Sequence, residues 1–206
     1  MRTGILGGTF DPIHIGHLHA GETAFHQAGL DRVLFIPAGR PWQKEGGSVS
    51  DPKHRLEMTR LGVDGVTGLE VDDREVLRDG PTYSVDTLLS FPDEEELFLV
   101  VGADAAVGIH TWHRAPEVLE RAGVLVVPRA GFDSRQVLET IPECLFLDMG
   151  ILEVSGTEIR SRVRAGEPFR FLVTERVHAY ITANDLYRQP SRDDMVEESS
   201  PMEESS

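Results

Sequence analysis

The feature that most constrains this chain is the alternation of short apolar runs with longer segments that have helical spacing. Runs rich in β-branched residues predict strands at 5–6, 33–36, 69–71, 97–101, 124–127 and 145–147. Helical spacing predicts helices over 17–28 and 52–63, the second opened by Asp51 as a cap and by Pro52 in its first turn. Because strands that alternate with helices pair in parallel, we expect an α/β fold with a mostly parallel sheet covered by helices on both faces.

The C-terminal part of the chain contains two further predicted helices and then changes in composition. Helices are expected over 156–165 and 174–183, and Gly166 is a suitable end for the first. Beyond Tyr187 the chain consists mostly of Pro, Ser, Asp and Glu, which is the composition of a disordered tail. A chain of 206 residues with 40% hydrophobic residues suits one domain. We therefore predict a single domain over 1–188 and an acidic tail over 189–206.

The charge and the apolar runs exclude several classes of partner. The net charge of −15 argues against binding to nucleic acid or to an anionic membrane. The apolar runs are too short to span a bilayer and the N-terminus has no signal-peptide pattern, so a cytoplasmic location is expected by default. The single cysteine, Cys144, leaves no disulfide and no cysteine-based zinc site within one chain. Any phosphate group must therefore be bound by backbone amides and a few basic side chains.

The residues after the first predicted strand are the strongest candidates for chemistry, because ligands of open α/β sheets bind at the carboxyl ends of strands. Gly7 and Gly8 allow the backbone to approach a ligand closely, and Gly16 removes a side chain beside two imidazoles. Those imidazoles, His14 and His17, lie at or just before a predicted helix N-terminus, where an anion is favoured. They could donate hydrogen bonds to a phosphate, but histidines at this spacing could also be metal ligands or incidental. No dinucleotide-binding glycine fingerprint and no P-loop is present.

Residues 7–18, Gly-Gly-Thr-Phe-Asp-Pro-Ile-His-Ile-Gly-His-Leu, resemble the signature of the nucleotidyltransferase superfamily with an HxGH motif, and in particular that of the bacterial nicotinate-nucleotide adenylyltransferases. The resemblance implies a Rossmann-like domain in which His14 and His17 are catalytic and stabilise the reacting phosphates. It also implies a set of ATP-binding residues in this stretch and after the fourth predicted strand: Gly7, Gly8, Thr9, Phe10, Gly16 and Gly102.

A second motif, Ser-Gly-Thr-Glu-Ile-Arg at 155–160, combines a structural and a functional interpretation. Ser155 and Glu158 match a capping box at the start of a helix. A capped N-terminus with a forked arginine one turn further on is also a good clamp for a triphosphate. The motif resembles the family's Ser-Ser-Thr-X-Ile-Arg, which implies that Ser155, Thr157 and Arg160 hold ATP phosphates. Gly156 departs from the family pattern and carries no hydroxyl.

The middle of the chain carries a resemblance to the family's acceptor site. Residues 80–88 are similar to the family stretch Gly-Pro-Ser-Tyr-Thr-Val-Asp-Thr-Leu, and on their own they predict a turn followed by a helix. The resemblance implies that backbone amides around Thr82, Tyr83 and Ser84 receive the pyridine carboxylate. Three further side chains are implied in substrate binding: Asp104 for a ribose hydroxyl or a ligand ammonium, Trp112 for the flat face of a pyridine ring, and Lys44 for the acceptor phosphate. Without the resemblance, Trp112 would be an ordinary core or surface aromatic and Lys44 a solvated charge.

The resemblance extends from Thr3 to Tyr187 and implies transfer of the adenylyl group of ATP to nicotinate mononucleotide, with formation of deamido-NAD and pyrophosphate in NAD biosynthesis. Magnesium is expected to enter with ATP, and no metal site of the protein's own is predicted. The alternatives are a related adenylyltransferase acting on nicotinamide mononucleotide or phosphopantetheine, a non-catalytic nucleotide-binding protein of the same fold, and a metal hydrolase that uses the two histidines. The sequence does not set the oligomeric state.

Overall fold

A computed structural model describes residues 1–40 and 49–188 of the chain. Lys44 and the tail expected over 189–206 lie outside the described residues, so these two predictions stay predictions. None of the helices within the described ranges is long and apolar enough to cross a membrane.

Six parallel strands form one sheet in the order β3-β2-β1-β4-β5-β6. The predicted parallel sheet is confirmed, and every neighbouring pair is parallel. The six strands are β1 Arg2–Gly8, β2 Arg32–Pro37, β3 Leu69–Val71, β4 Glu96–Gly102, β5 Ala122–Val127 and β6 Leu145–Phe146. β1 is much longer than the predicted 5–6 because Thr3 and three glycines interrupt its apolar pattern, while hydrogen bonds to strands on both sides hold it extended.

Nine α-helices cover the sheet in the described part of the chain. They are α1 Ile15–Gln27, α2 Pro52–Val63, α3 Arg74–Leu77, α4 Ser84–Leu88, α5 Ala103–Val107, α6 Ala115–Arg121, α7 Ser134–Thr140, α8 Gly156–Ala165 and α9 Glu175–Ala183, with short 3-10 turns η2 Ile109–Thr111 and η3 Arg170–Leu172. The predicted bounds of α2 and α8 are confirmed. α2 is capped by the Asp51 carboxylate, which accepts a hydrogen bond from the Lys53 amide, and Pro52 is its first residue.

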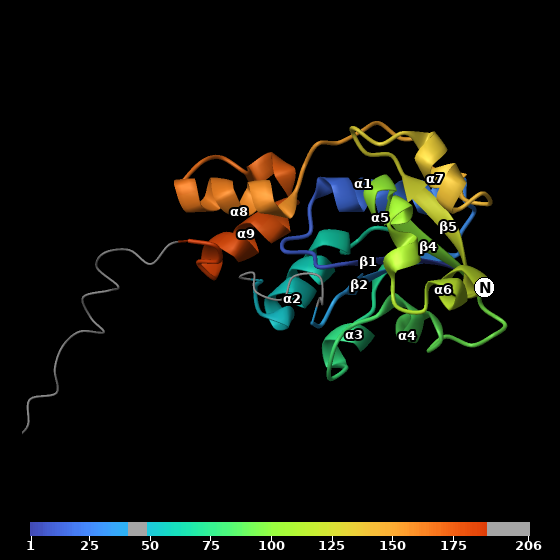
Figure 1. The fold of residues 1–206 in the computed structure, drawn as a ribbon. Coiled ribbons are helices and arrows are strands. Elements are labelled where there is room, and N and C mark those ends of the chain that lie inside the picture. The colour runs from blue at the N-terminus through green and yellow to red at the C-terminus, as the bar shows by residue number, and fades with distance from the viewer. Residues whose placement is uncertain (41–48, 189–206) are drawn as a thin grey trace, which may run out of the picture.

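Two hydrophobic cores form because successive residues of a strand face opposite sides of the sheet. In β5, for example, Val124 and Val126 belong to one core and Leu125 and Val127 to the other. One core packs the sheet against α1, α2, α8 and α9, and the other packs it against α4, α5, α6 and α7. Helices therefore cover both faces, as the sequence predicts. The C-terminal helices α8 and α9 lie together at one end of the molecule, where α9 contacts α2 (Figure 1).

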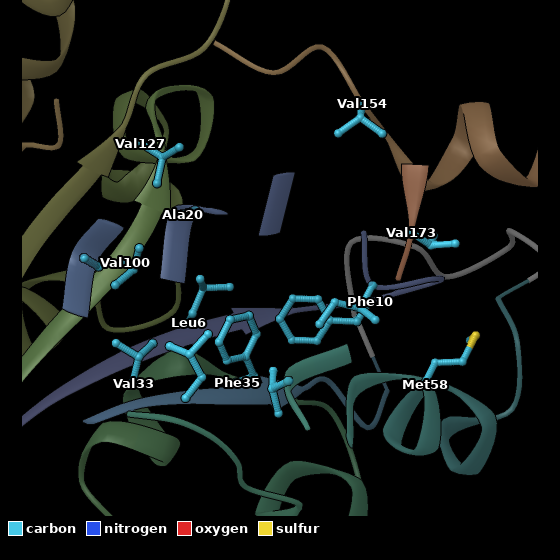
Figure 2. Packing of buried hydrophobic residues seen from close by; sticks show 14 of the residues in the cluster. Leu6, Phe10, Ala20, Val33, Phe35, Met58, Val100, Val127, Val154 and Val173 are labelled. Atoms are coloured by element: carbon cyan, nitrogen blue, oxygen red, sulfur yellow. The ribbon is translucent and has the colours of Figure 1, made fainter. Parts of the chain in front are cut away.

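The loop after β1 is anchored in the first of these cores by Phe10. The Phe10 side chain is 2% exposed, and its ring lies beside that of Phe35 at a centroid distance of 5.9 Å (Figure 2). Phe10 has a positive φ of 48°, a backbone conformation that a bulky residue adopts only when its surroundings enforce it. Packing in the core thus fixes the path of the chain between β1 and α1.

Candidate active site

β1 and β4 are neighbours at the centre of the sheet, and the strand order reverses between them. From β1 the strands continue through β2 and β3 to one edge, and from β4 they continue through β5 and β6 to the other. A crevice at the carboxyl ends of such strands is the usual ligand site of an open α/β sheet. Gly8 is the last residue of β1 and Thr9 follows it, while Gly102 is the last residue of β4 and Asp104 lies two residues further on. The topology therefore brings together two of the segments that the sequence singles out, 7–17 and 102–104.

Two cavities open at this edge of the sheet. The first, of about 310 Å³, lies toward α4 and is called the α4 cavity; its walls include Gly8, Glu75, Tyr83, Ser84, Trp112 and His113. The second, of about 610 Å³, lies toward α8 and is called the α8 cavity; its walls include Phe10, His14, Phe132, Ser155, Thr157 and Arg160. Both volumes are in the range of small-molecule sites. Four residues line both cavities: Thr9, His17, Asp104 and Arg129.

His14 and His17 stack on one another at the start of α1, with ring centroids 3.7 Å apart and an interplanar angle of 21°. The backbone N–H of His14 donates to Nδ1 of His17 at 3.4 Å. An imidazole that accepts a hydrogen bond at Nδ1 carries its proton on Nε2, so His17 keeps Nε2 as its donor. The edge of the His17 ring also contacts the buried Phe10 ring at a centroid distance of 5.0 Å. These contacts hold the His17 ring in place where the two cavities meet.

His14 is the more deeply buried of the pair and lines the α8 cavity, not the α4 cavity. Burial, and then the positive charge of Arg129, lowers the pKa of His14 to about 4. His14 is therefore neutral near pH 7. Its Nδ1 is buried, and the two histidines form a capping box across the first turn of α1, in which the His14 side chain faces the His17 amide and the His17 side chain accepts from the His14 amide. A Cβ at Gly16 would lie 3.2 Å from that nitrogen, so glycine at this position leaves room for the ring.

The N-terminus of α8 packs directly against the loop after β1. Ser155 caps α8 by accepting a hydrogen bond from the amide of Glu158. The second half of the predicted capping box is not formed, because the Glu158 carboxylate pairs with Arg162 one turn further on. A Cβ at Gly156 would lie 2.7 Å from the carbonyl oxygen of Asp11, so a side chain here would require the two segments to move apart.

Arg160 spans the same junction between α8 and the loop after β1. One guanidinium nitrogen donates to the carbonyl oxygen of Asp11 at 2.6 Å, and another donates to the hydroxyl of Thr157 at 3.2 Å. The Asp11 carboxylate, which is almost fully buried, accepts a hydrogen bond from the hydroxyl of Tyr187 at 2.7 Å. Residues from both ends of the described chain thus fix the position of Arg160 in the wall of the α8 cavity.

The start of α4 forms one wall of the α4 cavity. The amide of Thr82 donates to the carbonyl oxygen of Arg40 at 3.3 Å, and the Arg40 amide donates to the Thr82 hydroxyl at 3.2 Å. The Thr82 amide thus already has an acceptor within the protein, and Thr82 stays a predicted substrate-binding residue in the wall of the α4 cavity. The amides of Tyr83 and Ser84 have no acceptor among the described residues. The Tyr83 ring packs on His113 at a centroid distance of 4.4 Å.

Asp104 and Arg129 face each other at the junction of the cavities, with 3.9 Å between the Asp104 carboxylate and Nε of Arg129. Trp112 lies just after η2 and lines the α4 cavity but not the α8 cavity. Gly7, Gly8, Gly16 and Gly102 line the α4 cavity, whereas Phe10, Ser155, Thr157 and Arg160 line the α8 cavity. The residues grouped by the sequence as one ATP-binding set are thus divided between two cavities.

The sequence interpretation misses two arginines that shape this site. Arg129 follows β5 by two residues, so the rule that ligands bind at the carboxyl ends of strands could have found it. Arg55 is 1% exposed and donates to the carbonyl oxygens of Thr9, Gly39 and Ser50, which ties together three loops around the site. Within α2 it has the sequence pattern of an ordinary surface charge.

Over residues 1–40 and 49–188, no group of three or more His, Cys, Asp or Glu side chains is arranged to hold a metal ion. Arg129 and Arg160 are the arginine side chains in the walls of the α8 cavity, whose lining also includes the acidic residues Asp11, Asp104, Glu153 and Glu158. An anionic ligand at this junction therefore meets guanidinium groups, imidazoles and the N-terminus of α8.

Comparisons with known proteins agree with this geometry. Residues 5–162 match a family model described as cytidylyltransferase-like. The chain is 42% identical over 198 residues to a probable nicotinate-nucleotide adenylyltransferase of Desulfitobacterium hafniense, which covers 91% of this chain and 96% of the relative. It is 36% identical over 200 residues to a protein of the same description from Dehalococcoides mccartyi, covering 92% and 98%. The fold is similar to that of Plasmodium falciparum nicotinic acid mononucleotide adenylyltransferase complexed with NaAD, with a TM-score of 0.75, 17% identity, and coverage of 90% of this chain and 97% of that chain.

Proposed function

Because the chain belongs to the cytidylyltransferase-like family and, within it, to the nicotinate-nucleotide adenylyltransferases of NAD biosynthesis, we propose that its two cavities hold the two substrates of adenylyl transfer. The chain is a nucleotidyltransferase that uses ATP. In the proposal, the triphosphate of ATP occupies the α8 cavity and nicotinate mononucleotide occupies the α4 cavity. The observation that carries this assignment is that the two cavities share Thr9, His17, Asp104 and Arg129, so two bound substrates would meet there.

The reaction needs little covalent chemistry from the protein. The acceptor phosphate attacks the α-phosphorus of ATP in line, the bond between the α-phosphorus and the bridging oxygen breaks, and pyrophosphate leaves. Holding the two phosphates together at the shared residues removes most of the entropic cost of this encounter. His17 Nε2 and the Arg129 guanidinium then donate to phosphate oxygens as their charge is redistributed. Because His14 is neutral, it contributes an N–H dipole rather than a positive charge.

The leaving pyrophosphate is stabilised by the N-terminus of α8. The hydroxyls of Ser155 and Thr157 and the forked guanidinium of Arg160 lie in the wall of the α8 cavity and are suited to bind its oxygens. We propose that magnesium enters as part of the MgATP substrate, because Mg²⁺ is commonly held by substrate phosphates and only one or two carboxylates. We also propose a cytoplasmic location, in keeping with the sequence expectation.

The acceptor is recognised in the α4 cavity through its pyridine ring and its carboxylate. The amides of Tyr83 and Ser84 are the proposed donors to the carboxylate, because both line the cavity and neither has an acceptor among the described residues. Trp112 supplies a flat face for the ring. Lys44 stays the proposed ligand of the acceptor phosphate, although it lies outside the described residues.

The test is release of pyrophosphate from ATP by the purified full chain with each of three acceptors: nicotinate mononucleotide, nicotinamide mononucleotide and phosphopantetheine. We expect kcat/KM for the acid nucleotide to exceed that for the amide at least about tenfold, because an NH2 group aimed at donor amides leaves a buried hydrogen bond unmade. Similar constants for acid and amide would contradict the acceptor assignment and spare the transfer reaction. Binding of ATP without pyrophosphate release from any acceptor would contradict the reaction itself.

A further inference from the structure

Glu75 is a buried carboxyl group in the wall of the α4 cavity that the proposed reaction does not use. Its side chain lies in α3 and is 6% exposed. Oε1 of Glu75 accepts a hydrogen bond from the hydroxyl of Thr87 at 2.5 Å. Thr87 is buried in α4, one turn after the amides of Tyr83 and Ser84. Within residues 1–40 and 49–188, no basic side chain forms an ion pair with this carboxyl group.

A negative charge on Glu75 conflicts with an acidic substrate in the same cavity. The conflict rests on the proposed function, in which the pyridine carboxylate of the acceptor enters the α4 cavity. Two carboxylates that share a poorly solvated site cannot both ionise without a large cost, so one of them takes up a proton. The substrate carboxylate is held by donor amides, which favour its charged form, whereas Glu75 has one neutral hydroxyl donor.

The surroundings of Glu75 place its titration near neutral pH. Burial raises the pKa of Glu75 to about 7, against the opposing effects of the Thr87 hydrogen bond and the positive charge of Arg78. The other charged groups that act on it are Asp72, just before α3, and Arg74, the first residue of α3, and the titratable or charged groups elsewhere in the cavity walls are His17, Asp104, His113 and Arg129. A second carboxylate bound in the cavity would raise this pKa further, and a neutral carboxamide would not.

We propose that Glu75 makes the choice between acid and amide acceptors depend on pH, because it is protonated when the acid nucleotide is bound and can accept a hydrogen bond from the carboxamide when it is ionised. Above the pKa of Glu75, binding of the acid nucleotide therefore takes up a proton from solvent, and the preference for the acid falls as the pH rises. Glu75 acts here as a specificity-determining residue and takes no part in the bond-making step.

The experiment compares kcat/KM for nicotinate mononucleotide in the wild type, Glu75→Gln and Glu70→Gln from pH 6.5 to 8.5. Glutamine keeps the shape of Glu75 and an oxygen that accepts from Thr87, but it cannot ionise. The acceptor phosphate titrates equally in all three proteins, so the ratio of variant to wild type isolates the replaced carboxyl group. We expect the ratio for Glu75→Gln to rise about tenfold across this range, so that the variant overtakes the wild type at high pH. The control Glu70 is an exposed carboxylate on the neighbouring strand β3, and its ratio should stay constant.

The same titration with nicotinamide mononucleotide should show no rise in the ratio for Glu75→Gln. Thr87→Val is a second test, because it leaves Glu75 intact but removes a donor that stabilises its ionised form, which raises the pKa of Glu75. The fall in kcat/KM of the acid nucleotide should then move to higher pH.

A ratio for Glu75→Gln that does not change with pH, whether close to one or uniformly low, overturns the proposal and leaves Glu75 a structural role. If Glu75→Gln does not fold, an unshifted profile for Thr87→Val overturns the proposal by itself. These outcomes require an active wild type. Absence of pyrophosphate release by the wild type with nicotinate mononucleotide at every pH would instead contradict the proposed function.

Discussion

The α8 cavity and the α4 cavity share one junction, but they present different groups to an anion. The α8 cavity has the guanidinium of Arg160, the capped N-terminus of α8 and, at the junction, Arg129. The α4 cavity has neutral amides at the start of the short helix α4 and, close to them, the buried carboxyl group of Glu75. A triphosphate can be bound tightly by charge, whereas an acid is separated from its amide only by donors that fit one and not the other.

The walls of the two cavities are also stabilised by different contacts. Arg160 is positioned by Asp11, which is held in turn by Tyr187, and these residues are distant in the sequence. The start of α4 is positioned by a two-way backbone and hydroxyl pairing between Arg40 and Thr82. Separate supports of this kind should allow each cavity to be disturbed without the other, while a change at the junction should affect both substrates.

Replacing His17 is expected to have the largest effect, because this side chain lines both cavities. His17→Ala should lower kcat about a hundredfold or more, the usual scale for the loss of one preorganised donor to a developing anion. Steady-state kinetics at saturating concentrations of both substrates measures the loss. His19→Ala, elsewhere on α1, is the matched control and should retain turnover. Near-wild-type turnover of a folded His17→Ala protein would remove the phosphate role of this residue.

Arg160→Lys should disturb the α8 cavity alone. Lysine keeps the positive charge but cannot make both hydrogen bonds of the guanidinium fork, to Asp11 and to Thr157. We expect KM for ATP to rise about tenfold and KM for nicotinate mononucleotide to change by less than about twofold. Initial rates with each substrate varied in turn provide both constants. The exposed residue Arg164 of the same helix gives the control Arg164→Lys, and an equal rise in both constants for Arg160→Lys would argue against separate cavities.

Trp112→Ala should disturb the α4 cavity alone, with a smaller effect. Loss of the aromatic face should lower kcat/KM about fivefold to tenfold for both the acid and the amide nucleotide, since either ring stacks equally well. The acid-to-amide ratio and KM for ATP should stay nearly constant. A large fall in the acid-to-amide ratio of kcat/KM in this variant would show that Trp112, rather than the amides and Glu75, discriminates between the two acceptors.

Glu75→Gln should alter the pH dependence of stability as well as specificity. The pKa of Glu75 is raised to about 7 in the folded protein, so between its ordinary pKa and pH 7 the folded state holds a proton that the unfolded state has lost. The stabilisation is therefore fully present at low pH and is lost as the pH rises through about 7. Thermal denaturation of both proteins should show Glu75→Gln gaining at least about 1 kcal/mol relative to the wild type between pH 5 and pH 8. His14, whose pKa is lowered, contributes to the pH dependence of stability with the opposite sign, but equally in both proteins. A difference in stability between the two proteins that does not change with pH would contradict the raised pKa of Glu75.

Local patterns in the sequence were sufficient for the six strands, for α1, α2, α8 and α9 and for the helix after the turn at residue 80, but not for the short helices α3, α5, α6 and α7. Apolar periodicity predicts the parallel sheet and the bounds of α2 and α8, and the rule on strand ends locates the segments at 7–17 and 102–104. The same rule could have led to Arg129. Arg55 and Glu75 could not be found in this way, because each has the sequence pattern of an ordinary surface charge. Only burial in the folded protein lets Arg55 hydrogen-bond to three loops and raises the pKa of Glu75 in the wall of the α4 cavity.

By itself the sequence determined the order of the strands and of the longer helices, because these depend on apolar spacing over a few residues, and it determined the motifs, because their residues are adjacent. Only the tertiary structure decided which residues share a cavity. Arg160 donates to the Asp11 carbonyl across 149 positions in the sequence, and the Arg40 amide donates to the Thr82 hydroxyl across 42. Such contacts form when packed elements bring distant segments together, so no local pattern predicts that one set of phosphate ligands divides into two cavities that meet at Thr9, His17, Asp104 and Arg129.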